Sequence, residues 1–428
     1  MAQGRRPAPD VGLPVVGEAP PLLKDRGVHI LAALFLLFVG SYAFAAWHYD
    51  RIRPPRPKKI HMLVYGDGVF YYSFARSILF DRDLDTTNEC RYYWHDESAV
   101  EAWRSPTGKL NNYCPIGSSL LFVPFVLLIH LFVWGDGFSF AYPAAAAFGS
   151  SLLGWIAILM IYRWFRDLAV AIALWFGSNI AYYMSVEPLT SHSCSLFAVT
   201  LFTIYALRSG TGTGAWVTRG ILLGLAVLVR PEHIMLAPIA LRKKHMASFC
   251  TMLAVCTVVM LPQIFVWKSV SGTWISPVAG ATTVLPLNVL SIMFSTRHGV
   301  FMWHPVYLVG ATCAIIICRN RLGLIALLAI FGAILFYGTR TAWWGFHSFG
   351  SRYFVGLGFF FAVGLAAGAA WLRRLRWGGT LVWSICAILM LWNGSLMLLY
   401  VSRSISQSDA VPLRILLLAP IYAVRLLV

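Results

Sequence analysis

Long, unbroken apolar runs alternate with short polar segments along most of this chain. The runs have close to the length that a helix needs to cross a membrane, which is about 20 residues. They are residues 29–47, 141–163, 168–184, 193–207, 247–267, 305–318, 322–338, 354–372 and 378–401. None alternates apolar and polar residues as barrel strands do. The pattern predicts an all-α polytopic membrane protein with about 10–13 membrane helices in a single domain over residues 29–428.

Three further apolar stretches fit this pattern less simply. Residues 117–134 are expected to form an interfacial or re-entrant helix, because a full crossing there would place Arg163 on the outer side. Residues 220–240 carry Arg-Pro-Glu-His at their centre, which favours a helical hairpin with residues 230–233 at its outward tip. Residues 412–428 are short and basic, and their placement stays open.

Composition and charge exclude an ordinary soluble domain. Hydrophobic residues make up 59% of the chain and charged residues 12%, whereas soluble domains hold about twice that charged share. The net charge of +17 does not indicate nucleic-acid binding, because the basic residues form short clusters between apolar runs. Clusters at residues 242–245, 319–321 and 373–376 mark cytoplasmic loops under the positive-inside rule. The N-terminal tail, residues 1–28, is expected on the same side.

Polar, aromatic-rich segments lie on the opposite, outer side of this topology. The largest is residues 48–116, the first outer loop, which contains nine of the seventeen acidic residues. Within it, residues 71–80 have apolar positions at helical spacing and are expected to form a short helix on the membrane surface. The other outer segments are residues 185–193, 230–233, 294–305 and 339–353. Distant segments that meet on one face are typical of an active site built from loops.

Asp67 is the candidate catalytic residue of the first outer loop. A carboxylate beside a water-accessible cleft can take a proton from an attacking hydroxyl, which accelerates a reaction by roughly two to four powers of ten. The flanking Gly66 and Gly68 leave the backbone free to turn and leave space for a bulky reactant. Gly-Asp-Gly is also a common turn, and this structural interpretation stays open.

Arginines on the outer side need an explanation, because positive charge there runs against the topology. Arginine holds phosphate oxygens with paired, charge-assisted hydrogen bonds and stabilises charge on a departing phosphate. Arg352 is the first candidate, since it follows a small-residue turn that opens a span, and Arg297 and Arg230 are the next. Arg340 also lies in an outer segment. Structural ion pairing or snorkelling is the alternative for each of them.

Several other outer residues are candidates for supporting roles. Glu187 and His192 lie where two spans meet. Either is a candidate for a second acid or for a hydrogen-bond support of the site, and structural pairing with an outer arginine is the alternative. Trp303, Trp343 and Trp344 are placed either to stack on a sugar ring or to form the interfacial aromatic belt. The remaining supporting candidates are Tyr71, Tyr72 and His347.

Cysteine and histidine usage gives little indication of a metal. Cys90 and Cys114 both fall in the first outer loop and would form a disulfide if that loop faces an oxidising compartment, which the sequence leaves open. Outer histidines, among them His233, His298 and His304, lack helical i, i+4 spacing with acids. No metal or other cofactor is expected.

A set of motifs in order resembles a known family. The motifs are GDGVFYYSFARSILFDRDLD, NYCPIGSSLLFVPF, SVEPLTSHSCSLFAV, LVRPEHIML, FSTRHGVFMWHPV and WWGFHSFGSRYF. Over about residues 30–375 the chain resembles the polytopic bacterial glycosyltransferases of the GT-C fold, which include protein mannosyltransferase and lipid A aminoarabinose transferase relatives.

The resemblance implies a GT-C-like helical bundle and an inverting sugar transfer on the outer face of the bacterial inner membrane. The donor would be a polyprenyl-phosphate-linked sugar and the acceptor a glycan, lipid or protein. The acidic residue of the family's first outer loop corresponds to Asp67. Many relatives carry Asp-Glu there, whereas this chain has Asp67-Gly68, and Asp83 or Asp85 would have to supply a second carboxylate.

Two alternatives from other classes remain. A transporter or lipid flippase would show internal repeats and ionisable residues inside its spans. The sequence shows no repeat, and its charged residues collect at the membrane interface rather than inside the spans. A membrane acyltransferase or ligase-type polymerase would also use outer loops.

Overall fold

The computed structural model describes residues 21–52, 63–208, 210–275 and 287–427. Every regular element in these ranges is a helix. Five segments are long and apolar enough to cross a membrane, namely Ala141–Phe165, Met246–Ser271, Arg321–Gly338, Arg352–Leu372 and Gly378–Val401. This is the fold of a multi-pass membrane protein. Most of the predicted N-terminal tail, residues 1–20, lies outside the described residues.

Most apolar runs form helices close to their predicted positions. They are α1 (Arg26–Ile52), α6 (Ala141–Phe165), α9 (His192–Arg208), α11 (Met246–Ser271), α14 (Pro305–Ile316), α15 (Arg321–Gly338), α16 (Gly358–Leu372) and α17 (Gly378–Val401). Several short helical elements connect or follow these helices. They are η1 (Leu22–Lys24), η4 (Lys243–His245), α12 (Val289–Phe294), α13 (Val300–Trp303), η6 (Arg352–Leu357), α18 (Leu413–Leu417) and α19 (Ala419–Leu427). The segment 412–428, which the pattern could not place, packs as α19 against α17.

The predicted run 168–184 is not one helix, which corrects the sequence pattern. It breaks into α7 (Leu168–Phe176) and α8 (Ile180–Ser185). Asn393 of α17 donates from Nδ2 to the carbonyls of Phe176 and Ser178, at 2.9 and 2.8 Å. A break inside an apolar bundle is stable only when the freed backbone groups find partners, and Asn393 supplies one.

The predicted hairpin over residues 220–240 has its turn at the expected place. α10 (Thr213–Val229) begins earlier than expected, and the ten-residue η3 (Pro231–Ala240) follows it. Proline has no amide hydrogen and disfavours a helical residue before it, so α10 ends ahead of Pro231. The chain then returns towards its starting end, where Arg242 donates to the carbonyl of Ala206.

The first outer loop folds as a compact group of short helices. They are α2 (Asp67–Arg76), the π-helical turn η2 (Ser77–Asp81), α3 (Thr87–Trp94) and α4 (Glu97–Ala102), followed by α5 (Gly117–His130). The expected surface helix is wrong in one respect, because every residue of α2 from Gly68 to Arg76 is buried. Arg76 pairs with Asp81 at 2.5 Å and with Glu89 at 2.7 Å and so joins α2 to α3.

The disulfide that the sequence left open is not formed, since Cys90 and Cys114 are both free thiols. Each is buried in a different environment. Cys90 contacts Ser73 and Thr86, whereas Cys114 contacts Tyr71. The two cysteines therefore pack as small side chains in separate parts of the loop.

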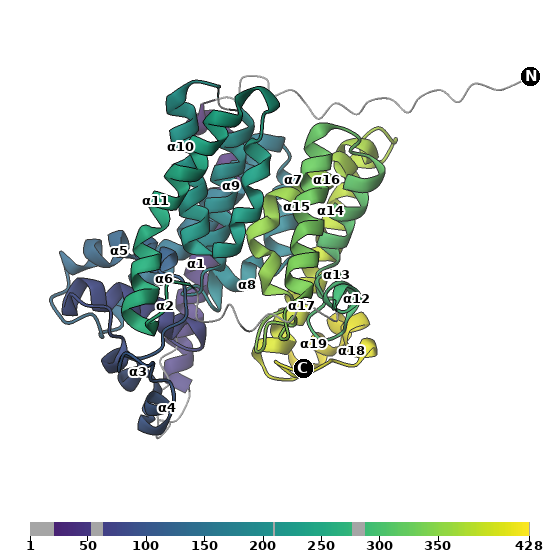
Figure 1. The fold of residues 1–428 in the computed structure, drawn as a ribbon. Helices are drawn as coiled ribbons and strands as arrows, with labels where there is room; N and C mark the ends of the chain where they lie inside the picture. The colour runs from purple at the N-terminus through teal and green to yellow at the C-terminus, as the bar shows by residue number, and fades with distance from the viewer. Residues whose placement is uncertain (1–20, 53–62, 209, 276–286, 428) are drawn as a thin grey trace, which may run out of the picture.

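Basic side chains collect at one end of the bundle, which we call the basic end. Asp25, before α1, pairs with Arg163 in the last turn of α6 and with Arg166 directly after it. Asp167 pairs with Arg373 after α16. This end is at the top of Figure 1, and the first outer loop, α12, α13, α18 and α19 lie towards the other end. The helices thus carry their basic loops to one end and the outer segments to the other, as the charge pattern predicts.

Candidate functional site

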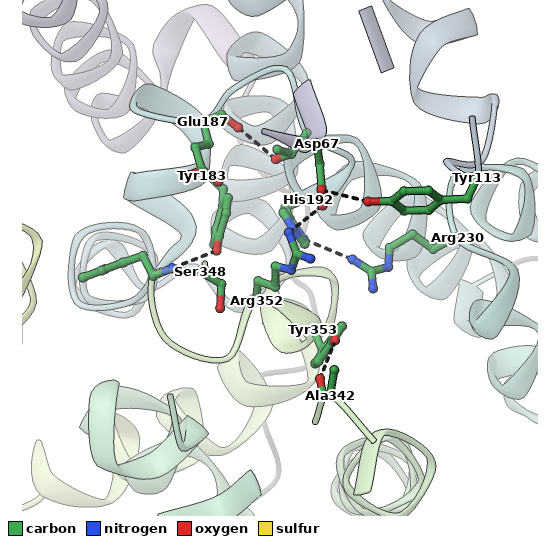
Figure 2. Close-up of polar contacts among 12 residues, drawn as sticks. Asp67, Tyr113, Tyr183, Glu187, His192, Arg230, Ala342, Ser348, Arg352 and Tyr353 are labelled. Carbon is green, nitrogen blue, oxygen red and sulfur yellow. Dashed lines mark hydrogen bonds and ion pairs between the residues drawn. The ribbon is translucent and has the colours of Figure 1, made fainter. Parts of the chain in front are cut away.

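An ion pair between Asp67 and Arg352 lies at the centre of the candidate site (Figure 2). Arg352 Nη1 is 2.6 Å from Asp67 Oδ2, although 285 residues separate them in sequence. Asp67 begins α2 and Arg352 begins η6. Their side chains are 27% and 14% exposed, so both are within reach of a ligand.

The backbone around Asp67 fits closely against the segment 186–189. Gly66 has φ +54°, which a glycine adopts without strain. A Cβ at Gly68 would lie 3.3 Å from the Leu189 Cβ, and the Tyr65 hydroxyl donates to the Val186 carbonyl at 2.8 Å. The two glycines therefore serve a turn and a close packing contact, in addition to any space they leave for a reactant.

Tyr113 is a neighbour of Asp67 to which the sequence analysis assigned no role, although it lies in the motif NYCPIGSSLLFVPF. Its hydroxyl donates to Asp67 Oδ1 at 3.2 Å, so the carboxylate has Tyr113 on one oxygen and Arg352 on the other. The sequence signals for Tyr113 were its place in that motif and its aromatic ring in a polar stretch of the first outer loop.

Arg230 lies beside this pair at the tip of the α10–η3 hairpin. It pairs with Glu232 at 2.7 Å, and its Nη1 lies 3.1 Å from His192 Nδ1, which accepts the hydrogen bond. Glu232 also accepts from the Tyr337 hydroxyl at 3.0 Å. Tyr71 contacts Ser191 and is within electrostatic reach of both Arg230 and Asp67. The structure thus brings Arg230, His192 and Tyr71 to the site, as expected.

Glu187 places a second carboxyl group near Asp67 and Arg352. Burial raises the pKa of Glu187 to about 7, because desolvation outweighs the hydrogen bond from Tyr182 and the attraction of Arg352. Tyr182 donates to Glu187 Oε1 at 2.9 Å. Glu187, rather than Asp83 or Asp85, is the acidic residue that the fold brings to Asp67.

Asp83 and Asp85 are engaged within their own loop. Asp83 Oδ1 accepts from the Ser77 hydroxyl at 2.6 Å and from the Asp85 amide at 3.1 Å. Asp85 Oδ1 accepts from the hydroxyl of Thr87 at 2.6 Å. Short-range turn contacts of this kind account for both carboxylates.

Two other candidates have contacts outside the central pair. Tyr72 donates to the Gly137 carbonyl at 2.6 Å, in the segment between α5 and α6. Arg297 donates to the Ser408 carbonyl at 2.7 Å and lies 3.8 Å over the Trp344 ring. His347 is exposed. Of the tryptophans considered for stacking, Trp303 is fully buried.

A turn formed by residues 345–351 leads into Arg352 and is held by buried polar side chains. Asn179, at the break between α7 and α8, donates to the Ser351 carbonyl at 3.1 Å and accepts from the Tyr307 hydroxyl at 2.8 Å. The Phe349 amide donates to the Tyr183 hydroxyl at 3.2 Å. The helix break therefore serves to fix the turn that presents Arg352.

Chemically, the site combines a carboxylate, two guanidinium groups and a carboxyl group that titrates near neutral pH. Such a set can accept a proton and stabilise an anion in one place. Within the described ranges no three His, Cys, Asp or Glu side chains gather as a metal site. No family model, curated protein or solved structure matches the chain.

Proposed function

We propose that this protein is an inverting glycosyltransferase that uses a polyprenyl-phosphate-linked sugar on the outer face of the bacterial inner membrane. The observation that carries the proposal is the 2.6 Å contact between Asp67 and Arg352. It joins a candidate base to a candidate phosphate ligand at the end of the bundle opposite the basic end. Shorter and broken helices would complete about 10–13 crossings in a GT-C-like bundle.

The proposed reaction assigns a role to Asp67, to Arg352 and to Arg230. The donor phosphate takes Arg352 away from Asp67, and the freed carboxylate removes the proton of an acceptor hydroxyl. That oxygen attacks the anomeric carbon from the face opposite the phosphate, and the carbon–oxygen bond to the phosphate breaks. The bonding electrons leave on the phosphate, which Arg352 and Arg230 stabilise. The apolar helices hold the polyprenyl tail.

The test is transfer by the purified protein from radiolabelled polyprenyl-phosphate sugars. D67N should lower the transfer rate by roughly two to four powers of ten while donor binding persists. D83N is the matched control, because it removes a carboxylate of the same loop whose contacts are local. Unchanged turnover by D67N would remove Asp67 as the base, and turnover of acyl donors alone would favour an acyltransferase.

One feature favours a second candidate function, a transporter or flippase. Transporters bind substrates at discontinuous helices, and the break between α7 and α8 is such a discontinuity. Here side chains of Asn179 and Asn393 occupy the break. Proteoliposomes that move a labelled polyprenyl-phosphate sugar between leaflets, without any transfer, would support this alternative.

A further inference from the structure

The first outer loop carries a cluster of aromatic rings beside Asp67, which we call the aromatic shelf: Phe70, Trp94, Trp103 and Tyr113. The Trp103 and Tyr113 ring centroids are 5.7 Å apart with planes inclined by 31°. The Phe70 and Tyr113 ring centroids are 5.0 Å apart, and those of Trp94 and Trp103 are 6.3 Å apart. Phe70 is 5% exposed, whereas Trp103 is 40% exposed. The shelf thus has a buried base and an open tryptophan.

Tyr113 links this shelf directly to the candidate base. The same ring that packs against Trp103 donates its hydroxyl to Asp67 Oδ1 at 3.2 Å. Trp103 is therefore linked to the carboxylate through one side chain. The reaction proposed above needs an acceptor hydroxyl at that carboxylate, and no group in the proposed mechanism holds the acceptor.

The surroundings of Trp103 face water rather than hydrocarbon. Glu101 and Arg104 pair at 2.6 Å on either side of it in sequence, with side chains 53% and 35% exposed. Arg91 and Glu97 form a second exposed pair at 2.6 Å. Figure 1 shows α3 and α4 projecting from the helical bundle. A lipid chain there would desolvate these charges without compensation, so burial of Trp103 in hydrocarbon does not fit.

A sugar ring matches both parts of this surface. Its axial C–H face packs against an aromatic ring, which offers a large and rigid contact area. Its equatorial hydroxyls extend sideways to charged groups such as the exposed ion pairs around Trp103. We propose that Trp103, Trp94 and Tyr113 form the acceptor subsite of the transfer reaction, and that the acceptor is a glycan. This inference rests on the proposed function for its catalytic meaning, but not for the binding of a saccharide.

Binding is tested first, without any donor. The full-length protein is labelled with 5-fluorotryptophan in nanodiscs, and the fluorine signal of Trp103 is assigned by its loss in W103F. Oligosaccharides of hexoses, pentoses and N-acetylhexosamines are then added at millimolar concentration. At least one series should shift the Trp103 signal in a saturable way. If all leave it unmoved, or if only added anionic lipid shifts it, the subsite is wrong.

Transfer is tested second, with Tyr92 as the matched control. Tyr92 is 42% exposed in the same loop but packs on Phe138, away from Tyr113. W103A should raise the acceptor KM by about tenfold, the range expected for a lost aromatic contact, with donor KM unchanged. W103F should recover most of this loss, and Y92A should behave as wild type. An equal loss in Y92A and W103A would contradict the subsite.

The two experiments separate the two proposals. Saccharide binding at Trp103 without transfer from any polyprenyl-phosphate sugar would contradict the proposed reaction but support a carbohydrate-binding site. Transfer that is insensitive to W103A would support the reaction but contradict the acceptor subsite.

Discussion

Single residues at the site contribute to chemistry and to stability in different proportions. The Asp67–Arg352 pair is mostly buried, with side chains 27% and 14% exposed, and removing one partner of a buried pair leaves an uncompensated charge that destabilises the fold. The effects of a substitution on activity and on stability must therefore be measured side by side.

Replacing Arg352 provides the first prediction at this scale. R352A should lower the transfer rate by about a hundredfold or more, because a donor of charge-assisted hydrogen bonds to the departing phosphate is lost. R352K should recover part of the rate, since lysine keeps the charge without the paired geometry. Transfer rates and melting temperatures of both variants check this. A melting temperature that falls in proportion to activity would instead assign Arg352 a structural role.

Glu187 provides a prediction about pH. The unfolded chain releases the Glu187 proton near the ordinary pKa of 4.5, whereas the folded protein releases it near 7. The folded state therefore binds more protons between these values, and stability falls as pH rises from about 4.5 to 7. Melting temperatures of wild type and E187Q across this range should show the fall attributable to Glu187 in wild type alone. Parallel curves would contradict the raised pKa.

The sequence predicted which residues gather at the candidate site better than it predicted which of them contact one another. Charge and topology were sufficient to select Asp67, Arg352 and Arg230. They were not sufficient to show that Arg297 turns to Ser408 or that Tyr113 reaches Asp67, because such contacts depend on where loops pack.

Among the elements, the turn of residues 345–351 depends on a buried histidine. Gly350 has φ +63°, and a Cβ there would lie 2.0 Å from His304 Nε2. His304 is held in turn by Asn393, with Nδ1 and Oδ1 3.1 Å apart. This turn precedes Arg352 directly, so its conformation sets where the guanidinium lies.

Gly350→Ala is the prediction at this scale. Both the strained φ and the clash should destabilise the protein by about 1–3 kcal/mol and lower the transfer rate through misplacement of Arg352. Gly332→Ala is the matched control, because a Cβ at that helical glycine meets nothing within 4 Å. Thermal unfolding and transfer of the two variants are compared. An unaffected Gly350→Ala protein would show that the turn has more freedom than the structure indicates.

The helix break between α7 and α8 shows what hydrophobic patterning misses. Residues 168–184 are apolar except for Gly177, Ser178 and Asn179, which lie at the break. The partners that stabilise the break, Asn393 above all, come from a helix more than 200 residues away. The available signals were this Gly-Ser-Asn turn cluster and the polar Asn393 inside the apolar run 378–401.

At the scale of the whole molecule, the two ends of the bundle differ in charge. The basic end is formed by Arg and Lys clusters that are visible in the sequence between the apolar runs, and the positive-inside rule predicts that such clusters share one side. The gathering of the outer segments at the other end requires an even number of crossings between each segment and the next. The count of crossings is thus the quantity on which the topology depends.

Cysteine labelling tests this topology. Ser98→Cys places a thiol on α4 in the first outer loop, and Thr211→Cys places one in the exposed turn before α10. In a Cys250→Ser background, an impermeant maleimide should label position 98 in intact cells and position 211 only after permeabilisation. Labelling of both positions from the same side would overturn the assignment of the outer face.

The contact between Asp67 and Arg352 has a kinetic consequence for the proposed reaction. While the two side chains are paired, Arg352 Nη1 occupies one oxygen of the carboxylate that an approaching alcohol would use. An anion that draws the guanidinium aside frees this oxygen. The proposed lipid-linked donor should therefore bind before the alcohol, and without it the carboxylate should be less available to activate water.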